Sequence, residues 1–141
     1  GAIANVACDD EMVATALTLA TKAVDRDLPI LAISGTVLEQ VAHKHGMKTF
    51  AEIFADRAYT SKGRLVSRAH PEAMVTDPVF AARRLVDFTK SGLMPTIDGG
   101  PIKLKADSIC VHGDSAHAVG MARAVRQALE AEGITLKRFI G

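Results

Sequence analysis

The feature of this chain that most constrains its fold is a regular alternation of helix-like and strand-like segments. Amphipathic stretches, with apolar residues three or four positions apart, alternate with short apolar runs that end at glycine or at charged residues. Strands separated by helices of roughly 10 to 18 residues predict parallel βα units. The pattern predicts helices at 9–26, 36–45, 77–91 and 115–132, strands at 28–34, 48–56, 107–112 and 134–140, and two short strands flanking a turn at 98–100.

The length of 141 residues suits one domain, and we expect residues 1–141 to form it. An α/β chain of this kind leaves two architectures open, an open doubly wound sheet or part of a (β/α) barrel. In both, ligands bind at the carboxyl ends of the parallel strands. That rule points to Ser34 with Gly35, to Asp56 with Arg57, and to the segment 112–114.

The charge and cysteine content argue against several classes of protein. Seventeen Lys and Arg against sixteen Asp and Glu give a net charge of +1, so we expect no binding to nucleic acid or to a membrane surface. The chain also has no Trp and one Tyr, which argues against stacking on nucleic-acid bases. Two distant cysteines, Cys8 and Cys110, form neither a disulfide framework nor a CxxC zinc site, which favours the reducing cytoplasm. No apolar run reaches the roughly 18 residues that span a bilayer. Because the chain begins with Gly1 rather than Met, we expect a processed or engineered chain, or a piece of a longer one.

The segment around His112 is the clearest candidate for chemistry. Side chains alternate along a strand, so Cys110 and His112 share one face of the predicted strand. His112 and Asp114 can serve as a base and the group that orients it. In the alternative interpretation Asp114 only caps the following helix and His112 is a core residue. Cys110 suits a small buried strand residue better than a nucleophile paired with His112.

A second group of candidates lies on the strand predicted at 48–56. Glu52 and Asp56 share one face of it, and a carboxylate inside a buried strand needs a partner, which a barrel lumen or an active site would supply. Asp56 and Arg57 at the strand end can orient a planar substrate, or they form a structural pair.

The segment 57–74 has the composition of a functional or mobile loop. It is polar, contains Gly63 and Pro71 and shows little periodicity. Arg68 within it is either a substrate clamp or a solvated loop arginine. Neither GxxxxGK[ST] nor GxGxxG occurs in the chain, so the sequence contains no phosphate-binding loop of these kinds.

Several segments stand in a characteristic order and spacing: FADRAYT at 54–60, then Gly63, Leu65, Val66 and Arg68, then KAD at 105–107 and CVHGD at 110–114. Gly1, Ala2 and Asn5 match the end of a KPHGALYN segment. Over essentially the whole chain these residues resemble the LamB/YcsF family, whose members act as the A subunit of the bacterial ATP-dependent 5-oxoprolinase. The chain departs from the family pattern at Ala4, Ser67 and Glu72.

The resemblance implies a fold and a partner. The family fold is a TIM-like (β/α) barrel of the glycoside hydrolase/deacetylase type, with about 250 residues, and this chain resembles its second half. The N-terminal Asp- and His-rich motifs, which would supply any metal ligands, are absent from it. Half a barrel exposes two sheet edges, so we expect it to pair with the missing half, to self-associate or to rearrange.

The resemblance also implies an activity, the hydrolysis of the lactam of 5-oxoproline to glutamate, coupled to ATP by other 5-oxoprolinase subunits. With no phosphate loop in this chain, ATP is expected to be handled wholly or partly elsewhere, and a metal requirement stays open. The alternatives are a catalytically inactive truncated domain with a structural or assembly role, and a small flavodoxin-like binding domain. The resemblance implies that Asp56 and His112 act as acid–base or water-orienting groups and that Asp114 supports His112. It implies that Arg57 and Arg68 bind the substrate carboxylate or a phosphorylated intermediate. Hydrogen bonding in the site is implied for Asn5, Glu52 and Tyr59.

Overall fold

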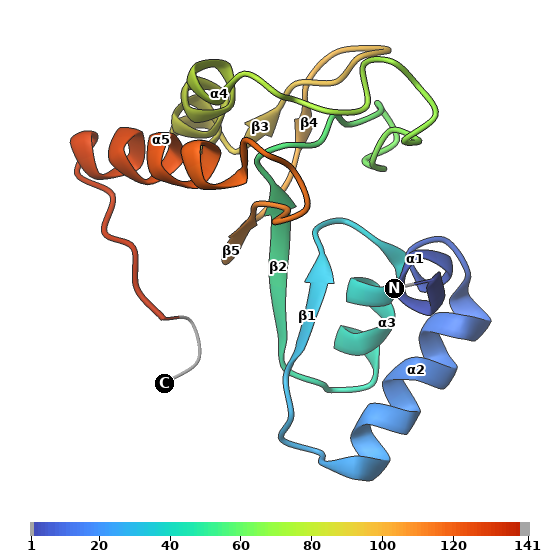
Figure 1. The fold of residues 1–141 in the computed structure, drawn as a ribbon. Coiled ribbons are helices and arrows are strands. Elements are labelled where there is room, and N and C mark those ends of the chain that lie inside the picture. The colour runs from blue at the N-terminus through green and yellow to red at the C-terminus, as the bar shows by residue number, and fades with distance from the viewer. Residues whose placement is uncertain (1, 139–141) are drawn as a thin grey trace. The chain divides into compact units, whose positions relative to one another are not determined.

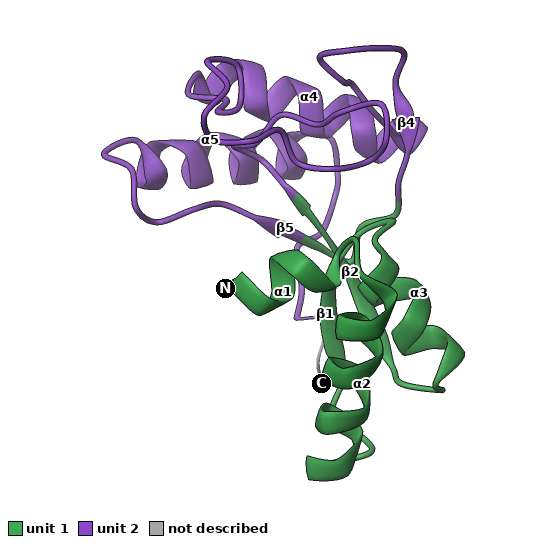
Figure 2. Cartoon of the chain, turned by 90° about the vertical axis from the view of Figure 1, so that its right-hand side faces the viewer, with its two compact units in different colours: residues 1–53, 105–108 green, residues 54–104, 109–141 purple. Residues whose placement is uncertain are grey.

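The computed structural model describes residues 2–138, which divide into two compact units (Figure 2). Unit 1 comprises residues 1–53 and 105–108, and unit 2 comprises residues 54–104 and 109–141. The chain is α/β, as the alternating pattern predicted. The expectation that residues 1–141 fold as one domain stays a prediction. No helix among residues 2–138 has the length and apolar character needed to cross a membrane.

Unit 1 is built around a parallel βαβ arrangement. The strands β1 (Ile30–Ile33) and β2 (Thr49–Phe54) pair in parallel, with Ile30 opposite Thr49, and α3 (Val37–Lys44) connects them (Figure 1). Two helices, α1 (Ala2–Ala7) and α2 (Glu11–Val24), precede this arrangement. The parallel βα unit predicted from the sequence is therefore confirmed, whereas α1 was not predicted.

The core of unit 1 follows the two periodicities of its elements. On α3, Leu38, Val41 and Ala42 fall on one helical face and are buried. On β1, Ile30 and Ala32 are buried and the residue between them is exposed, as in a strand with one face on a core. These residues form one cluster with apolar residues of α1 and α2.

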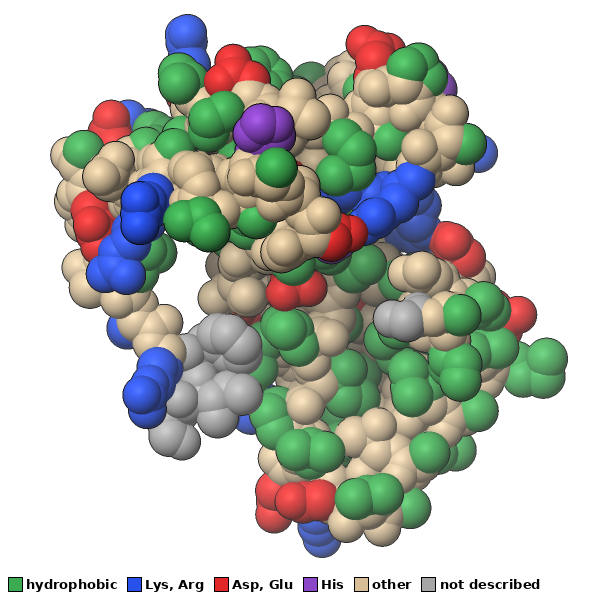
Figure 3. All heavy atoms as spheres, in the orientation of Figure 1, with side chains coloured by type: hydrophobic (Ala, Val, Ile, Leu, Met, Phe, Trp, Pro, Cys, Tyr) green, Lys and Arg blue, Asp and Glu red, His purple; other side chains and the backbone are tan. Residues whose placement is uncertain are grey.

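The helix α2 has a side-chain cap at its N-terminus and exposed apolar side chains along its length. Asp10 is its N-cap, and the Asp10 carboxylate accepts a hydrogen bond from the Val13 N–H at 2.9 Å. The outer face keeps large apolar side chains, since Met12 and Val24 are 77% and 82% exposed. Hydrophobic side chains of this kind are drawn green in Figure 3.

Unit 2 contains two helices that pack against each other, α4 (Pro78–Ser91) and α5 (Ala118–Ala131). Leu85 and Phe88 of α4 and Met121, Val125 and Leu129 of α5 are buried at helical spacing. The strands of this part of the chain are β3 (Leu93–Met94) and β4 (Ile102–Lys103), which pair antiparallel, and β5 (Ser108–Cys110), which begins at the unit boundary.

The boundaries of α4 are set by its own sequence. Asp77 is the N-cap and accepts a hydrogen bond from the Val79 N–H at 2.9 Å, and Pro78 occupies the first helical position, where its missing N–H costs nothing. Gly92 ends the helix at φ 71°, a left-handed conformation that a side chain would strain. Both ends were predicted correctly.

The three-stranded sheet has the order β1-β2-β5, which makes β2 its central strand. The segment that follows β2 carries only two isolated bridges, Arg57 to Met74 and Tyr59 to Leu65. The irregular loop predicted at 57–74 is therefore confirmed. A small cluster of its own, made of Ala58, Val66 and Ala73, gives this loop a buried interior.

Two sequence predictions fail in the C-terminal region. The N-cap of α5 is His117, which makes no side-chain capping bond, because the segment 113–117 forms turns before the helix begins. Asp114 is therefore not the N-cap of α5, and this part of the alternative interpretation is wrong. Of the strand predicted at 134–140, residues 134–138 form no strand, and residues 139 and 140 lie outside the described residues.

Candidate active site

The centre of the candidate site is a buried carboxylate paired with a histidine in unit 2. The Oδ1 atom of Asp56 lies 2.9 Å from Nδ1 of His112, and Oδ2 accepts a hydrogen bond from the His112 backbone N–H at 3.0 Å. Asp56 is only 6% exposed, whereas 23% of the His112 side chain is exposed. One carboxylate therefore fixes both the backbone and the ring of His112.

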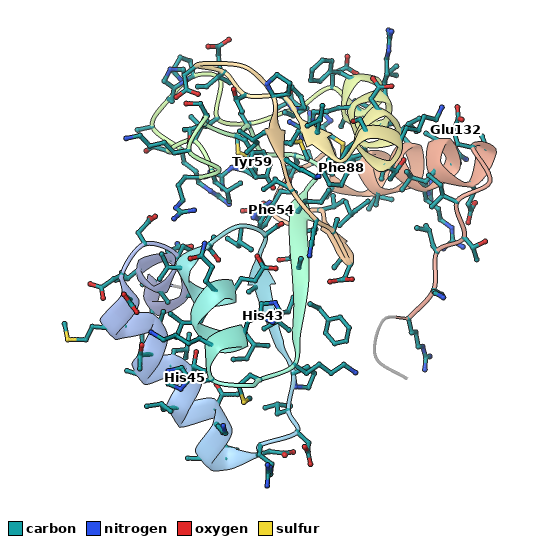
Figure 4. All side chains as sticks on the ribbon, turned by 180° about the vertical axis from the view of Figure 1, so that it is seen from behind. His43, His45, Phe54, Tyr59, Phe88 and Glu132 are labelled. Carbon is teal, nitrogen blue, oxygen red and sulfur yellow. The ribbon has the colours of Figure 1, made fainter. Side chains whose placement is uncertain are left out.

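This pair forms where the ends of β2 and β5 are joined by a hydrogen bond. The Ala55 N–H donates to the Cys110 carbonyl at 2.9 Å, which places the residues that follow each strand beside one another. The His112 ring stacks on the Phe54 ring, with centroids 5.4 Å apart and planes inclined by 19°. Phe54, labelled in Figure 4, therefore limits the rotation of the imidazole.

The structure assigns His112 a different partner from the one that the sequence predicted. The prediction was Asp114, two residues away, but the hydrogen-bonded carboxylate is that of Asp56. Asp114 instead forms an ion pair with Arg68, at 3.4 Å between Oδ2 and Nη1. Both side chains of that pair are more than half exposed, so water screens the interaction and it contributes at most about 1 kcal/mol.

A small pocket in unit 2 lies beside the Asp56–His112 pair. Both residues line it, together with the polar residues Thr76, Ser115 and His117 and apolar side chains from neighbouring positions. Its volume is about 40 Å³, which exceeds the roughly 10–15 Å³ that a water molecule needs. The site can therefore hold a water molecule next to the histidine.

Arg57 is buried and holds the loop that follows it. Its guanidinium donates to the Val66 carbonyl at 2.6 Å and to the Ala73 carbonyl at 3.4 Å. Burial lowers the pKa of Arg57, and the positive charge of Arg68 lowers it further, while the negative charge of Asp56 opposes both effects. The sequence analysis expected Arg57 to bind a substrate, but its Nε and Nη2 atoms donate to the protein backbone.

The hydrogen-bonding residues proposed from the resemblance lie in different places. Tyr59 is 1% exposed, and its hydroxyl oxygen accepts a hydrogen bond from the Phe54 N–H at 3.0 Å, so it supports the end of β2 (Figure 4). Glu52 is half-buried on β2, and Asn5 is exposed on α1, both in unit 1. Cys110 is a partly buried thiol of β5.

One residue of this region was missed by the sequence analysis. Arg84 of α4 is 6% exposed, and its guanidinium donates to the carbonyl oxygens of Phe54, Ala55 and Arg57 at 2.7 to 3.1 Å. The signal was present in the sequence, because Arg84 occupies the same helical stripe as the apolar residues Leu85 and Phe88. An arginine within an apolar stripe indicates a buried polar network.

The side chains known to coordinate metals do not cluster in the part of the chain that the structure describes. Across residues 2–138, no group of three or more His, Cys, Asp or Glu side chains could hold a metal ion.

The comparisons with known proteins agree on one family. The model of the LamB/YcsF family matches residues 1–140. The 5-oxoprolinase A subunit of Gluconobacter oxydans is 47% identical over 137 residues, which are 97% of this chain and 54% of that protein. The 5-oxoprolinase A subunit of a Thermus thermophilus strain is 42% identical over 139 residues, which are 99% of this chain and 56% of that protein.

A solved structure gives the same result. The crystal structure of a lactam utilization protein from Thermus thermophilus matches with a TM-score of 0.88 and 40% identity, covering 99% of this chain and 55% of that one. The chain therefore spans about half the length of these relatives.

Proposed function

The chain belongs to the LamB/YcsF family, and on that premise we propose that it takes part in hydrolysing a lactam, with 5-oxoproline opened to glutamate. The observation that carries the proposal is the hydrogen-bonded pair of Asp56 and His112 beside a pocket in unit 2. A carboxylate that holds an imidazole, next to space for water, is an arrangement suited to base-assisted hydrolysis.

The proposed chemistry assigns one role to each member of the pair. A neutral His112 that donates its Nδ1 proton to Asp56 carries its lone pair on Nε2. Nε2 takes a proton from a water molecule as that water adds to the lactam carbonyl. The ring C–N bond then breaks as the imidazolium returns the proton to the departing nitrogen. The new carboxylic acid gives its proton to the released amine, so the products are a carboxylate and an ammonium group. Asp56 stabilises the imidazolium between these steps.

The substrate carboxylate has a candidate partner in Arg68. Its present partner is Asp114, and because both side chains are exposed, exchanging one carboxylate for another costs little. A guanidinium binds a carboxylate through two parallel hydrogen bonds, which suits the carboxylate of 5-oxoproline. We assign Arg57 to holding the loop that carries Arg68, since its guanidinium already donates to two loop carbonyls.

The use of ATP and the need for partner subunits are proposed here from the family and not from the geometry of the Asp56–His112 site. ATP, where the complete enzyme uses it, supplies free energy for ring opening. The chain has neither of the common phosphate-binding loops, so we assign none of its residues to ATP. We propose that other 5-oxoprolinase subunits carry that step, which is supported by the word "subunit" in the names of the relatives.

We propose further that the βα units of this chain are part of a (β/α) barrel. The parallel pairing of β1 with β2 and the position of Asp56 and His112 beyond strand ends support it. In this arrangement the remaining strands come from the portion of the relatives that this chain does not span.

The test of the proposed function is turnover by the full-length protein assembled with its partner subunits. With ATP present, we expect glutamate to form from 5-oxoproline and expect 2-pyrrolidinone, the same ring without a carboxylate, to react far more slowly. Equal rates for the two lactams would refute the role of Arg68. An assembly that binds its subunits but forms no glutamate would refute the activity and favour an inactive domain with an assembly role.

A further inference from the structure

Arg84 forms an unusual buried contact in unit 2. A buried arginine is ordinarily paired with a carboxylate, but the three acceptors around this guanidinium are all backbone carbonyls. Nη2 donates to Phe54 at 3.1 Å and to Ala55 at 2.7 Å, and Nη1 donates to Arg57 at 3.0 Å. The Nε atom of Arg84 is buried and has no partner among the described residues.

The three carbonyls lie on both sides of Asp56 in the sequence. Two precede it, at positions 54 and 55, and one follows it, at position 57. A planar guanidinium offers its donors in fixed directions, so it holds all three carbonyls in one geometry. Fixing the backbone on both sides of Asp56 fixes the direction in which its carboxylate points, and that carboxylate in turn holds His112.

An apolar residue at position 84 would leave three backbone carbonyls without this donor, but the arginine carries costs of its own. Leu85 and Phe88 on the same helix are buried, so an apolar residue at position 84 would continue the stripe. It would also avoid the cost of burying a charge and of leaving Nε unpaired. Burial lowers the pKa of Arg84, and electrostatic interactions with Tyr59 and with the carboxylate of Asp56 oppose that effect. The buried cation is therefore electrostatically coupled to Asp56.

We propose that Arg84 is a positioning residue for the Asp56–His112 pair: it fixes the turn that carries Asp56 and keeps a positive charge next to the carboxylate that orients His112. This inference rests on the proposed function of the pair. Arg84 touches neither the pocket nor His112 among the contacts of the structure, so its effect passes through Asp56.

The test compares Arg84→Met with Arg84→Lys and uses Arg83→Met as the matched control, because Arg83 is the adjacent, exposed arginine of the same helix. The full-length protein is labelled with ¹⁵N in its histidine rings, and the His112 signals are identified by their loss in His112→Gln. Each variant is also measured for kcat, KM and thermal unfolding.

We expect Arg84→Met to shift the ring ¹⁵N signals of His112 from the Nδ1–H tautomer toward an average of the two tautomers. We also expect kcat to fall about 10- to 100-fold with KM within about threefold. Arg84→Lys, which keeps the charge and can donate to the same carbonyls, should recover most of kcat. Arg83→Met should match the wild type in both readouts.

A folded Arg84→Met variant with wild-type ring signals would overturn the inference, whatever its kcat. If Arg84→Met fails to unfold cooperatively, Arg84→Gln replaces it, because a glutamine amide donates without charge, and the same spectrum decides. The ring spectrum is independent of turnover. If Asp56 and His112 are not catalytic, Arg84→Met still moves the ring signals while kcat stays constant, so failure of the proposed function is distinguishable from failure of this inference.

Discussion

Replacing Asp56 by asparagine should separate the chemistry of the Asp56–His112 pair from its contribution to stability. The carboxylate accepts two hydrogen bonds from His112, one from the backbone N–H at 3.0 Å and one from the ring at 2.9 Å. An asparagine carbonyl can keep the first. Its NH₂ group then faces Nδ1, which must become an acceptor, so the ring proton moves to Nε2 and the base is lost.

The two effects differ in size. The variant exchanges two charge-assisted hydrogen bonds, worth about 1.5–3 kcal/mol each, for two neutral ones, worth about 0.5–1.5 kcal/mol each, so the free energy of unfolding should fall by about 2 kcal/mol. Loss of the general base should lower kcat by about 10²- to 10⁴-fold. A protein that still folds should therefore be nearly inactive.

The assay is 5-oxoproline turnover by the full-length assembly, with urea unfolding of the same preparations. Asp87→Asn makes the same chemical change at an exposed position of α4 and should leave both quantities unchanged. If Asp56→Asn retains kcat within threefold while the tautomer of His112 changes, the acid–base role is wrong. If it loses several kcal/mol of stability, the pair is mainly structural.

Three other substitutions test the surroundings of the site. Arg57→Met removes the bonds to two loop carbonyls and should lower the free energy of unfolding by about 2 kcal/mol, with faster limited proteolysis within 58–73; unchanged proteolysis would contradict its role in holding the loop. Arg68→Ala should change stability by less than about 1 kcal/mol, because its ion pair is exposed, but should raise KM for 5-oxoproline; an unchanged KM would exclude it as the carboxylate partner. Gly92→Ala should cost about 1 kcal/mol in urea unfolding because φ is 71° there; a stabilised variant would contradict the assigned helix end.

The local elements of the fold could be predicted from the sequence because their signals are local. Asp77 with Pro78 begins α4 and Gly92 ends it, as capping and backbone preferences require. The strand β1 was recognisable as an apolar run followed by glycine. The helix α1 was missed because its six residues include no acidic residue in the first turn and no basic residue in the last, and are too few to show a helical period.

The site could be predicted only in part, because its central contact joins distant segments. The rule that ligands bind at strand ends selected both Asp56 and His112. Which carboxylate faces His112 depends on which strand ends lie together, and a single sequence does not specify that order. Asp114 was chosen because it is close in sequence, whereas the actual partner lies 56 positions away.

The backbone contacts of Arg57 could not be predicted for a related reason. At the end of a strand an arginine can contact a ligand or the backbone, and the choice depends on the path of the loop at 57–74. That loop folds back so that the carbonyls of Val66 and Ala73 reach the guanidinium. The irregular composition of the loop was evident from the sequence, but its path is set by tertiary contacts.

The central claim is that His112 is the base of a lactam hydrolase, and the most direct test is the rate of the His112→Gln variant. In the full-length assembly with 5-oxoproline and ATP, glutamine keeps hydrogen-bonding capacity but cannot take up a proton at neutral pH. We predict that kcat falls by at least about 100-fold while the subunits still assemble. The control variant His45→Gln, at the end of α3 in unit 1, should be fully active. A His112→Gln assembly that turns over 5-oxoproline at the wild-type rate would contradict the account.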